Sequence, residues 1–189
     1  GEEQGLLGSK HFLRQRPAAL AGLEIVFAIN LDMIGRLRQR LEVFGTRSAV
    51  GLEQLITRAN NLPEATALPL TFDWKVEPDS DHYSFLQRGI PTLMFHTGLH
   101  DDYHRPSDDV HLVNLVGLEP VIRLTFATLL AVADSHAERF TFRRRCLSES
   151  NASKRRLEAA AVLPADRPSR WGIGTRRDDA NPAAPVVVA

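Results

Sequence analysis

The chain has 189 residues, enough for one domain of ordinary size with a tail, and its hydrophobic fraction of 43% is enough for a packed core. No apolar run reaches the roughly 18 residues of a membrane-spanning helix, so we expect no membrane span. The single cysteine, Cys146, excludes an intramolecular disulfide and a cysteine-based zinc site. A bound metal would therefore have to be held by His, Asp and Glu.

The N-terminal part of the chain predicts a short helix followed by a buried strand. The stretch GLLGSKHFLRQ places its apolar side chains roughly on one face, which predicts a helix starting at about residues 4–5. Residues 25–31 are almost continuously apolar, as strands are when both faces of their sheet are covered. Asp32 follows this strand directly and should therefore lie at the edge of the sheet.

Further apolar patterns predict an alternation of strands and helices along the rest of the chain. They are a strand in RLEVFGT, a helix over about residues 48–61, a strand in LPLTFDW, a short helix in DHYSFLQRG, a strand in PTLMFHTG and a long helix over 114–135. This order fits an α/β sandwich. Loops at the carboxyl ends of its strands are the favoured place for a site, and INLDMIG and FHTGLHDDYHRPSDD carry acids or histidines there.

The charge is distributed unevenly, although the net charge is zero. Residues 139–177 hold eleven basic and three acidic residues, a net charge of +8, whereas residues 1–138 hold eighteen acidic and twelve basic residues, a net charge of −6. We therefore expect a domain over 1–138 and a basic, flexible linker over 139–169. The basic stretch lacks interleaved aromatic residues, so we expect no nucleic-acid partner.

Glu2 and Glu3 stand side by side ahead of the first apolar run, and two explanations fit them. One is helix capping, because acidic residues in or before a first turn complement the helix dipole by about 0.3–1 kcal/mol. The other is a metal site, in which Glu3 binds the cation while Glu2 stays free, with a raised pKa, and moves a proton. The two residues alone leave both explanations open.

The loop HTGLHDDYHRPSDD collects three histidines and four aspartates within fourteen residues. Neutral imidazole is a common zinc ligand, and neighbouring carboxylates orient its ring. We favour His104, flanked by Tyr103 and Pro106, as a metal ligand, with His100 second. Asp32 is a further candidate, although a turn aspartate that hydrogen-bonds nearby backbone would give the same local pattern.

Four segments taken together resemble the co-catalytic zinc exopeptidases of the bacterial leucyl aminopeptidase and aminopeptidase Y type. They are GEEQGLLGS, INLDMIGR, SDHYSFLQRGIPTLMF and DDYHRPSDD. The superfamily also contains glutamate carboxypeptidase and glutaminyl cyclase. The resemblance covers about residues 1–136 and implies a three-layer α/β/α sandwich with a mixed, mostly parallel sheet. It also implies a metallo-aminopeptidase that hydrolyses N-terminal residues from peptide substrates by means of metal-activated water.

The resemblance implies a role for each of the acidic and histidine residues singled out above. Glu2 corresponds to the general base, and Glu3 and His104 correspond to ligands that share one metal. Asp32 corresponds to the ligand of a second metal. Two zinc ions are therefore expected in the complete enzyme.

Four further residues are implied to surround this centre. Asp81 and His82, in SDHYSF, match a family motif that lies near the site without binding metal. Met33 and Tyr103 correspond to positions close to the pocket for the substrate's N-terminal side chain.

The family also requires a histidine and a metal-bridging aspartate upstream of the Glu–Glu pair, and these have no counterpart here. We therefore expect this chain to be the C-terminal part of a catalytic domain, truncated at its N-terminus and inactive by itself. Residues 170–189 loosely resemble the opening of a PDZ-type domain, with a disordered tail as the alternative.

Two other functions stay open within the same fold. One is a glutaminyl cyclase-like acyl transferase, and the other is a non-catalytic, receptor-like ectodomain. Relatives are mostly exported, so the resemblance implies a periplasmic or secreted location, and we expect a monomer.

Overall fold

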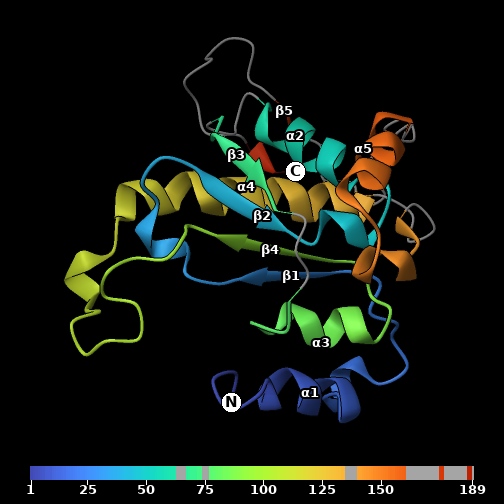
Figure 1. Ribbon diagram of the computed structural model, residues 1–189, viewed down its shortest axis with the longest axis horizontal. Helices are drawn as coiled ribbons and strands as arrows, with labels where there is room; N and C mark the ends of the chain where they lie inside the picture. The colour runs from blue at the N-terminus through green and yellow to red at the C-terminus, as the bar shows by residue number, and fades with distance from the viewer. Residues whose placement is uncertain (63–66, 74–76, 135–139, 161–174, 177–186, 189) are drawn as a thin grey trace.

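The central sheet has four strands among the residues that the computed structural model describes, which are 1–62, 67–73, 77–134, 140–160, 175–176 and 187–188. The strands are β1 (Ala28–Leu31), β2 (Leu41–Phe44), β3 (Leu70–Phe72) and β4 (Thr92–His96). They lie in the order β1-β4-β2-β3 (Figure 1). The β1–β4 and β2–β3 pairs are parallel and the β2–β4 pair is antiparallel, so the predicted mixed, mostly parallel sheet is confirmed.

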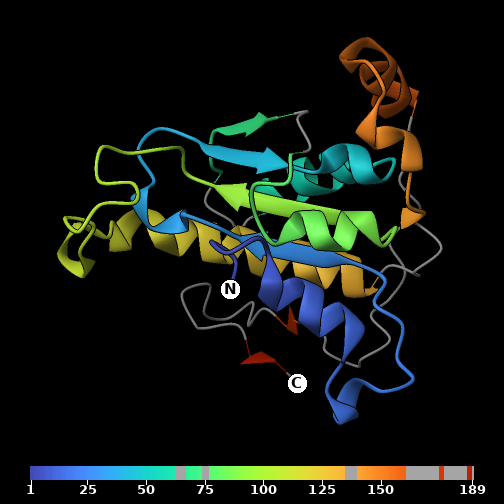
Figure 2. The same ribbon diagram turned by 60° about the horizontal axis from the view of Figure 1, so that its bottom comes forward.

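Helices cover both faces of this sheet. On one face lie α2 (Leu52–Asn60) and α4 (Leu115–Asp134), which also pack against each other. On the other face lie α3 (His82–Gln87) and, outside it, α1 (Leu7–Arg14), as Figures 1 and 2 show from two sides. The arrangement is the predicted three-layer sandwich, and it leaves the carboxyl ends of β1 and β4 at one end of the molecule.

The main hydrophobic core lies between the sheet and the α2–α4 layer. Alternate strand residues share one face of a sheet, and this alternation sends one set of side chains from β2 and β4 into the core. The strand residues of this set are fully buried, and burying each contributes about 1.5–3 kcal/mol. They are Leu41, Val43, Leu93 and Phe95.

The first strand differs from its prediction in length and burial. β1 covers only Ala28–Leu31, and its residues are half-buried or exposed instead of buried on both faces. In the described sheet β1 pairs with β4 alone, so it forms an edge. Its apolar composition therefore reflects one packed face and one partly covered face.

The long helix α4 is strongly apolar, and only some of its apolar side chains are buried in the core. By length and composition alone, Leu115–Ala133 could cross a membrane. However, Val121 and Leu124 are fully buried in the core, whereas Ile122 and Phe126 are more than half exposed. Packing on the core accounts for part of the apolar pattern, and the absence of a membrane span stays an expectation.

Part of the segment expected to be a flexible linker is structured. It contains a 3₁₀ turn over Arg144–Leu147 and α5 (Asn151–Ala160). Phe140 is buried and stands edge-on to Phe27 at 6.1 Å. Arg143 pairs with Glu149, whose side chain is also largely buried. The main body therefore continues past residue 138, because these residues pack against it.

The C-terminal residues are described only in part. Thr175–Arg176 (β5) and Val187–Val188 (β6) pair as antiparallel strands. Most of 170–189 lies outside the described residues, so the PDZ-like start stays a prediction.

Candidate metal centre and active site

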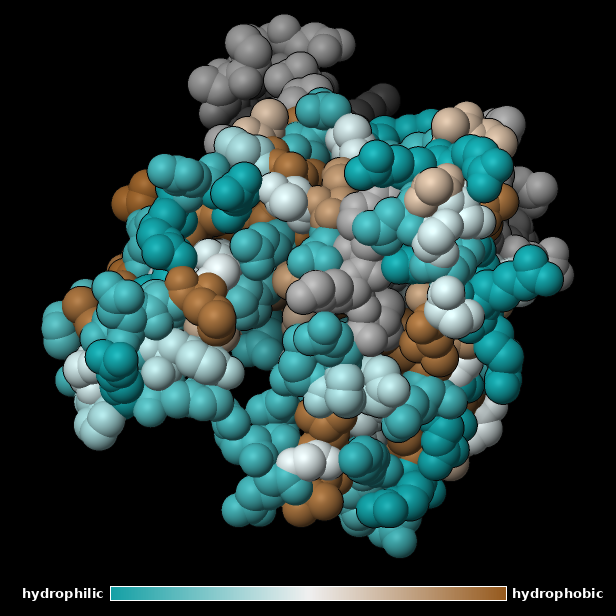
Figure 3. Space-filling view, viewed as in Figure 1, coloured by the Kyte–Doolittle hydropathy of each residue, from teal (hydrophilic) through white to brown (hydrophobic). Residues whose placement is uncertain are grey.

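A cavity of about 650 Å³ opens where β1 and β4 end. Figure 3 shows the surface hollowed between the loop at the left and the N-terminal part at the bottom, with mainly hydrophilic residues around the hollow. Among the residues that the structure describes, the cavity wall contains six carboxylates, two imidazoles and no Lys or Arg. Its titratable residues are Glu2, Glu3, Asp32, Glu42, Asp79, Asp108, His96, His104 and Tyr103.

The Glu–Glu pair reaches the cavity from a turn and not from a helix. The carbonyl of Glu2 accepts hydrogen bonds from the amides of Gly5 (3.0 Å) and Leu6 (2.8 Å). The helix α1 begins only at Leu7, its first turn contains no acidic residue, and no side chain caps it. The helix-capping explanation of Glu2 and Glu3 therefore finds no support.

Sheet pairing positions Asp32. Its amide donates to the Phe95 carbonyl (3.1 Å), which continues the β1–β4 ladder by one step beyond Leu31. Two residues earlier, Asn30 donates to the Ser80 hydroxyl (2.8 Å) and so ties the end of β1 to the turn before α3. Asp32 thus enters the cavity from the sheet edge.

His104 comes from the loop after β4, and two contacts hold that loop. The ring of Tyr103 stacks on the His104 ring, with centroids 3.9 Å apart and planes inclined by 22°. Arg36 forms ion pairs with Asp102 and Asp108 on either side of this pair. The Arg36 anchor therefore fixes both flanks of the segment that carries His104.

A close contact joins two of the predicted metal ligands, His104 and Glu3. Nε2 of His104 lies 3.1 Å from Oε1 of Glu3, and both side chains are more than half exposed. Two donors bound to one tetrahedral zinc at about 2.0–2.1 Å would stand about 3.3 Å apart. The pair therefore fits neighbouring ligands of one zinc.

The described part of the chain does not complete a metal site. No group of three or more His, Cys, Asp or Glu side chains there converges closely enough to hold an ion. Asp32 and Glu2 line the same cavity as the Glu3–His104 pair without joining a common point. The donor types of Glu3, His104 and Asp32 suit zinc.

The surroundings of Glu2 raise its pKa. Partial burial is the largest cause, followed by the negative charges of Glu3, Asp32 and Asp81, while His104 acts in the opposite direction. A carboxylate with a raised pKa is a better proton acceptor, as a general base requires.

Backbone strain gathers around the cavity. Met33 and His104, which line it, have φ values of 51° and 54°, in the left-handed region that is unfavourable for side chains with a Cβ. Leu6, just after the Glu2 turn, has φ 61°. Such strain costs of order 1–3 kcal/mol per residue and clusters at functional sites.

The remaining predicted residues line two different cavities. Met33 and Tyr103 line it, as expected for residues close to a bound substrate. Asp81 and His82 instead line a neighbouring cavity between α3 and β1, and His82 is almost fully buried. His100, the second choice for a ligand, lies near Asp108 (3.9 Å) and does not line the main cavity.

Three titratable cavity residues were not predicted individually from the sequence. Glu42 and His96 lie opposite each other on β2 and β4, and Asp79 lies ahead of α3. The one sequence signal that could have indicated Glu42 was its charge inside the otherwise apolar strand LEVF. That Glu42 faces His96 depends on the register between β2 and β4, which the local sequence does not show.

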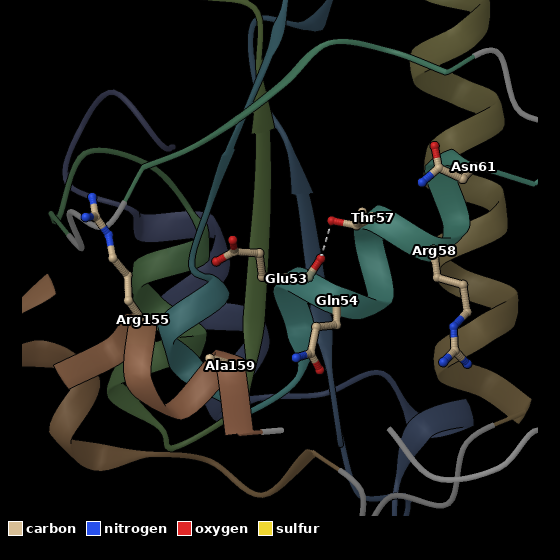
Figure 4. Close-up of a pocket in the computed structure, with 7 residues that line it drawn as sticks. All are labelled: Glu53, Gln54, Thr57, Arg58, Asn61, Arg155 and Ala159. Carbon is tan, nitrogen blue, oxygen red and sulfur yellow. Dashed lines mark hydrogen bonds between the residues drawn. The ribbon is translucent and has the colours of Figure 1, made fainter. Parts of the chain in front are cut away.

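A second cavity of about 480 Å³ lies between α2 and α5 (Figure 4). Its residues are Glu53, Gln54, Thr57, Arg58, Asn61, Arg155 and Ala159, and the hydroxyl of Thr57 donates to the Glu53 carbonyl (2.8 Å). It contains no histidine and one carboxylate, which does not suit zinc. This second cavity, as the described residues line it, is therefore not a candidate for a zinc site.

Solved structures of aminopeptidases share this fold. The LapA aminopeptidase of Legionella pneumophila aligns with a TM-score of 0.61 and 20% identity, over 72% of this chain and 38% of that one. An aminopeptidase from Aneurinibacillus sp. strain AM-1 aligns with a TM-score of 0.52 and 26% identity, over 68% and 31%. BSAP, a zinc aminopeptidase from Bacillus subtilis, aligns with a TM-score of 0.55 and 22% identity, over 75% and 36%.

This chain therefore spans between 31% and 38% of the length of those structures. A search of curated proteins finds no match. The model of peptidase family M28 matches residues 1–129, about two thirds of the chain. This chain belongs to peptidase family M28.

Proposed function

We propose that this chain is part of a zinc aminopeptidase, which removes N-terminal residues from peptides. The observation that carries the proposal is the 3.1 Å approach of His104 to Glu3 inside a cavity that also contains Glu2 and Asp32. Membership of a peptidase family and the shared fold with aminopeptidases support it.

The residues divide into those that hold metal and those that act on the substrate. Glu3 and His104 would hold one zinc and Asp32 a second, with further ligands from outside the described residues. When bound, zinc would acidify a water molecule and polarise the substrate carbonyl.

Glu2 moves the proton. Its carboxylate accepts a proton from the attacking water and then gives it to the amine nitrogen that leaves when the peptide bond breaks. The environment that raises its pKa favours this exchange. Met33 and Tyr103 would contact the N-terminal part of the substrate, and Asp81 and His82 support the site from the neighbouring cavity.

The test is metal content and hydrolysis of leucine p-nitroanilide by the full gene product. Glu2→Gln should keep its zinc and lose turnover by about 10²–10⁴-fold, because it removes the proton acceptor and leaves the ligands in place. Glu24→Gln is the matched control, since Glu24 is exposed and outside the cavity. A folded protein that binds no zinc would overturn the proposal.

The same assays separate the two alternatives. Cyclisation of N-terminal glutamine without hydrolysis of any aminoacyl anilide would favour the acyl transferase. Absence of both zinc and turnover would favour the receptor-like ectodomain. The position of Asp32 in the cavity favours the two-metal peptidase, because a one-metal enzyme needs no ligand there. An exported, monomeric enzyme remains our expectation.

A further inference from the structure

β2 and β4 contribute a second group of side chains to the candidate active-site cavity. In their antiparallel register Glu42 faces His96, and Phe44 faces Met94. All four line the cavity. They occupy the sheet face opposite the main core, because the core takes the alternate residues of both strands.

On the side of the cavity formed by β2 and β4, most side chains are apolar or aromatic. The Met33 sulfur lies 3.1 Å from Nε2 of His96, and the Phe44 ring stands edge-on to the His96 ring, with centroids 6.1 Å apart. Met94 and Leu99 add further apolar surface. Such walls suit a flexible chain of methylene groups.

The carboxylate of Glu42 is the exception on this wall. Its side chain is 34% exposed, and its one ion-pair contact among the described residues is with Nδ1 of His96 at 3.5 Å. That nitrogen accepts a hydrogen bond from the Gly98 amide (2.9 Å), so a neutral imidazole has no proton there to give to Glu42.

No basic side chain in the described part of the chain forms an ion pair with Glu42. Arg38 donates to the Leu99 carbonyl (2.6 Å) instead. Among the described residues, the wall of the candidate active-site cavity contains no Lys or Arg. Arg38 and Arg40 line a neighbouring cavity together with Glu42, and neither forms an ion pair with it. A half-buried carboxylate that forms no ion pair with Lys or Arg loses part of its hydration without a direct compensating contact.

We propose that Glu42 is a specificity-determining residue, which makes the enzyme prefer peptides that begin with Lys or Arg. This inference rests on the proposed aminopeptidase function. The methylene groups of the substrate side chain pack on Met33 and Phe44, and its cation pairs with Glu42. A neutral side chain of the same shape leaves the carboxylate unpaired and is rejected.

The experiment compares lysine p-nitroanilide with norleucine p-nitroanilide on the zinc-loaded full gene product. The two side chains have nearly the same shape and differ in the terminal ammonium, so their kcat/KM ratio measures the effect of the charge. We expect the wild-type protein to prefer lysine by at least about tenfold. Glu42→Gln should remove this preference, because lysine loses its ion-pair partner and norleucine no longer leaves a carboxylate unpaired, whereas Glu24→Gln should leave the kcat/KM ratio unchanged.

Three outcomes distinguish a failure of the proposed role of Glu42 from a failure of the proposed aminopeptidase function. A wild-type protein that hydrolyses norleucine at least as well as lysine keeps the proposed function and overturns the role of Glu42. A lysine preference that persists in Glu42→Gln, with norleucine hydrolysis intact, also overturns that role. A zinc-loaded protein that hydrolyses neither compound overturns the proposed function and this inference with it. The wild-type ratio does not depend on whether the variant folds.

Discussion

Nε2 of His104 lies 3.1 Å from Oε1 of Glu3, although one residue follows the last central strand and the other precedes the first helix. The contact joins the N-terminal turn to the loop after β4. It is the structural basis for assigning one metal to this pair of side chains.

Replacing His104 should weaken zinc binding. His104→Ala removes one of the two proposed donors that lie 3.1 Å apart, so we expect zinc affinity to fall by at least about 100-fold. Zinc content after dialysis against a weak chelator measures this loss. His111→Ala is the control, because His111 is exposed and does not line the cavity. Equal zinc retention in both variants would exclude His104 as a ligand.

Gly45 should resist substitution more strongly than a glycine of similar backbone conformation. A Cβ at Gly45 (φ 82°) would lie 2.2 Å from the Thr92 carbonyl oxygen, whereas a Cβ at Gly22 (φ 80°) meets nothing within 4 Å. Both alanine variants incur about 1–2 kcal/mol for the left-handed conformation. Only Gly45→Ala adds a clash, for a total of about 2–5 kcal/mol.

Urea denaturation of the two glycine variants measures this difference in the free energy of unfolding. Equal destabilisation would mean that β2 and β4 do not approach as closely as the structure shows.

The buried imidazole of His82 should make stability depend on pH. Burial lowers its pKa below the ordinary value of 6.5, and this effect outweighs the opposing charges of Asp79, Asp32 and Asp81. Between its folded and unfolded pKa values the unfolded chain binds more protons. The contribution is therefore complete above about pH 6.5 and is lost as pH falls through the folded-state pKa.

Urea midpoints at several pH values from 7.5 downward test this dependence. His82→Gln should flatten the decline, whereas His111→Gln, at an exposed position, should leave it unchanged. The same slope in wild type and His82→Gln would contradict the assignment.

Phe95 should be a major contributor to stability. Its side chain is fully buried between the sheet and the α2–α4 layer. Phe95→Ala should therefore lower the free energy of unfolding by about 3–5 kcal/mol, because it removes buried apolar atoms and leaves a cavity. Val110→Ala, at a position 85% exposed, should change stability by less than about 0.5 kcal/mol. Thermal and urea unfolding of both variants provides the check, and similar midpoints would place Phe95 outside the core.

The local sequence determined which segments become strands and helices, because the period of apolar residues reflects the face that each element buries. The apolar runs in LEVF and TLMFH became β2 and β4, and the 114–135 pattern became α4. Glu2, Glu3, Asp32 and His104 could be selected because their residue types and order match a family motif.

Tertiary structure alone decided which of these residues meet. Glu3 reaches His104 only because the β1–β4 pairing and the Arg36 ion pairs bring separate segments to one end of the sheet. Glu42 faces His96 through strand register, and α5 lies in a segment whose basic composition predicted a flexible linker. Periodicity is a local property, whereas register and strand order depend on contacts between distant residues, so the sequence of each segment alone could not specify them.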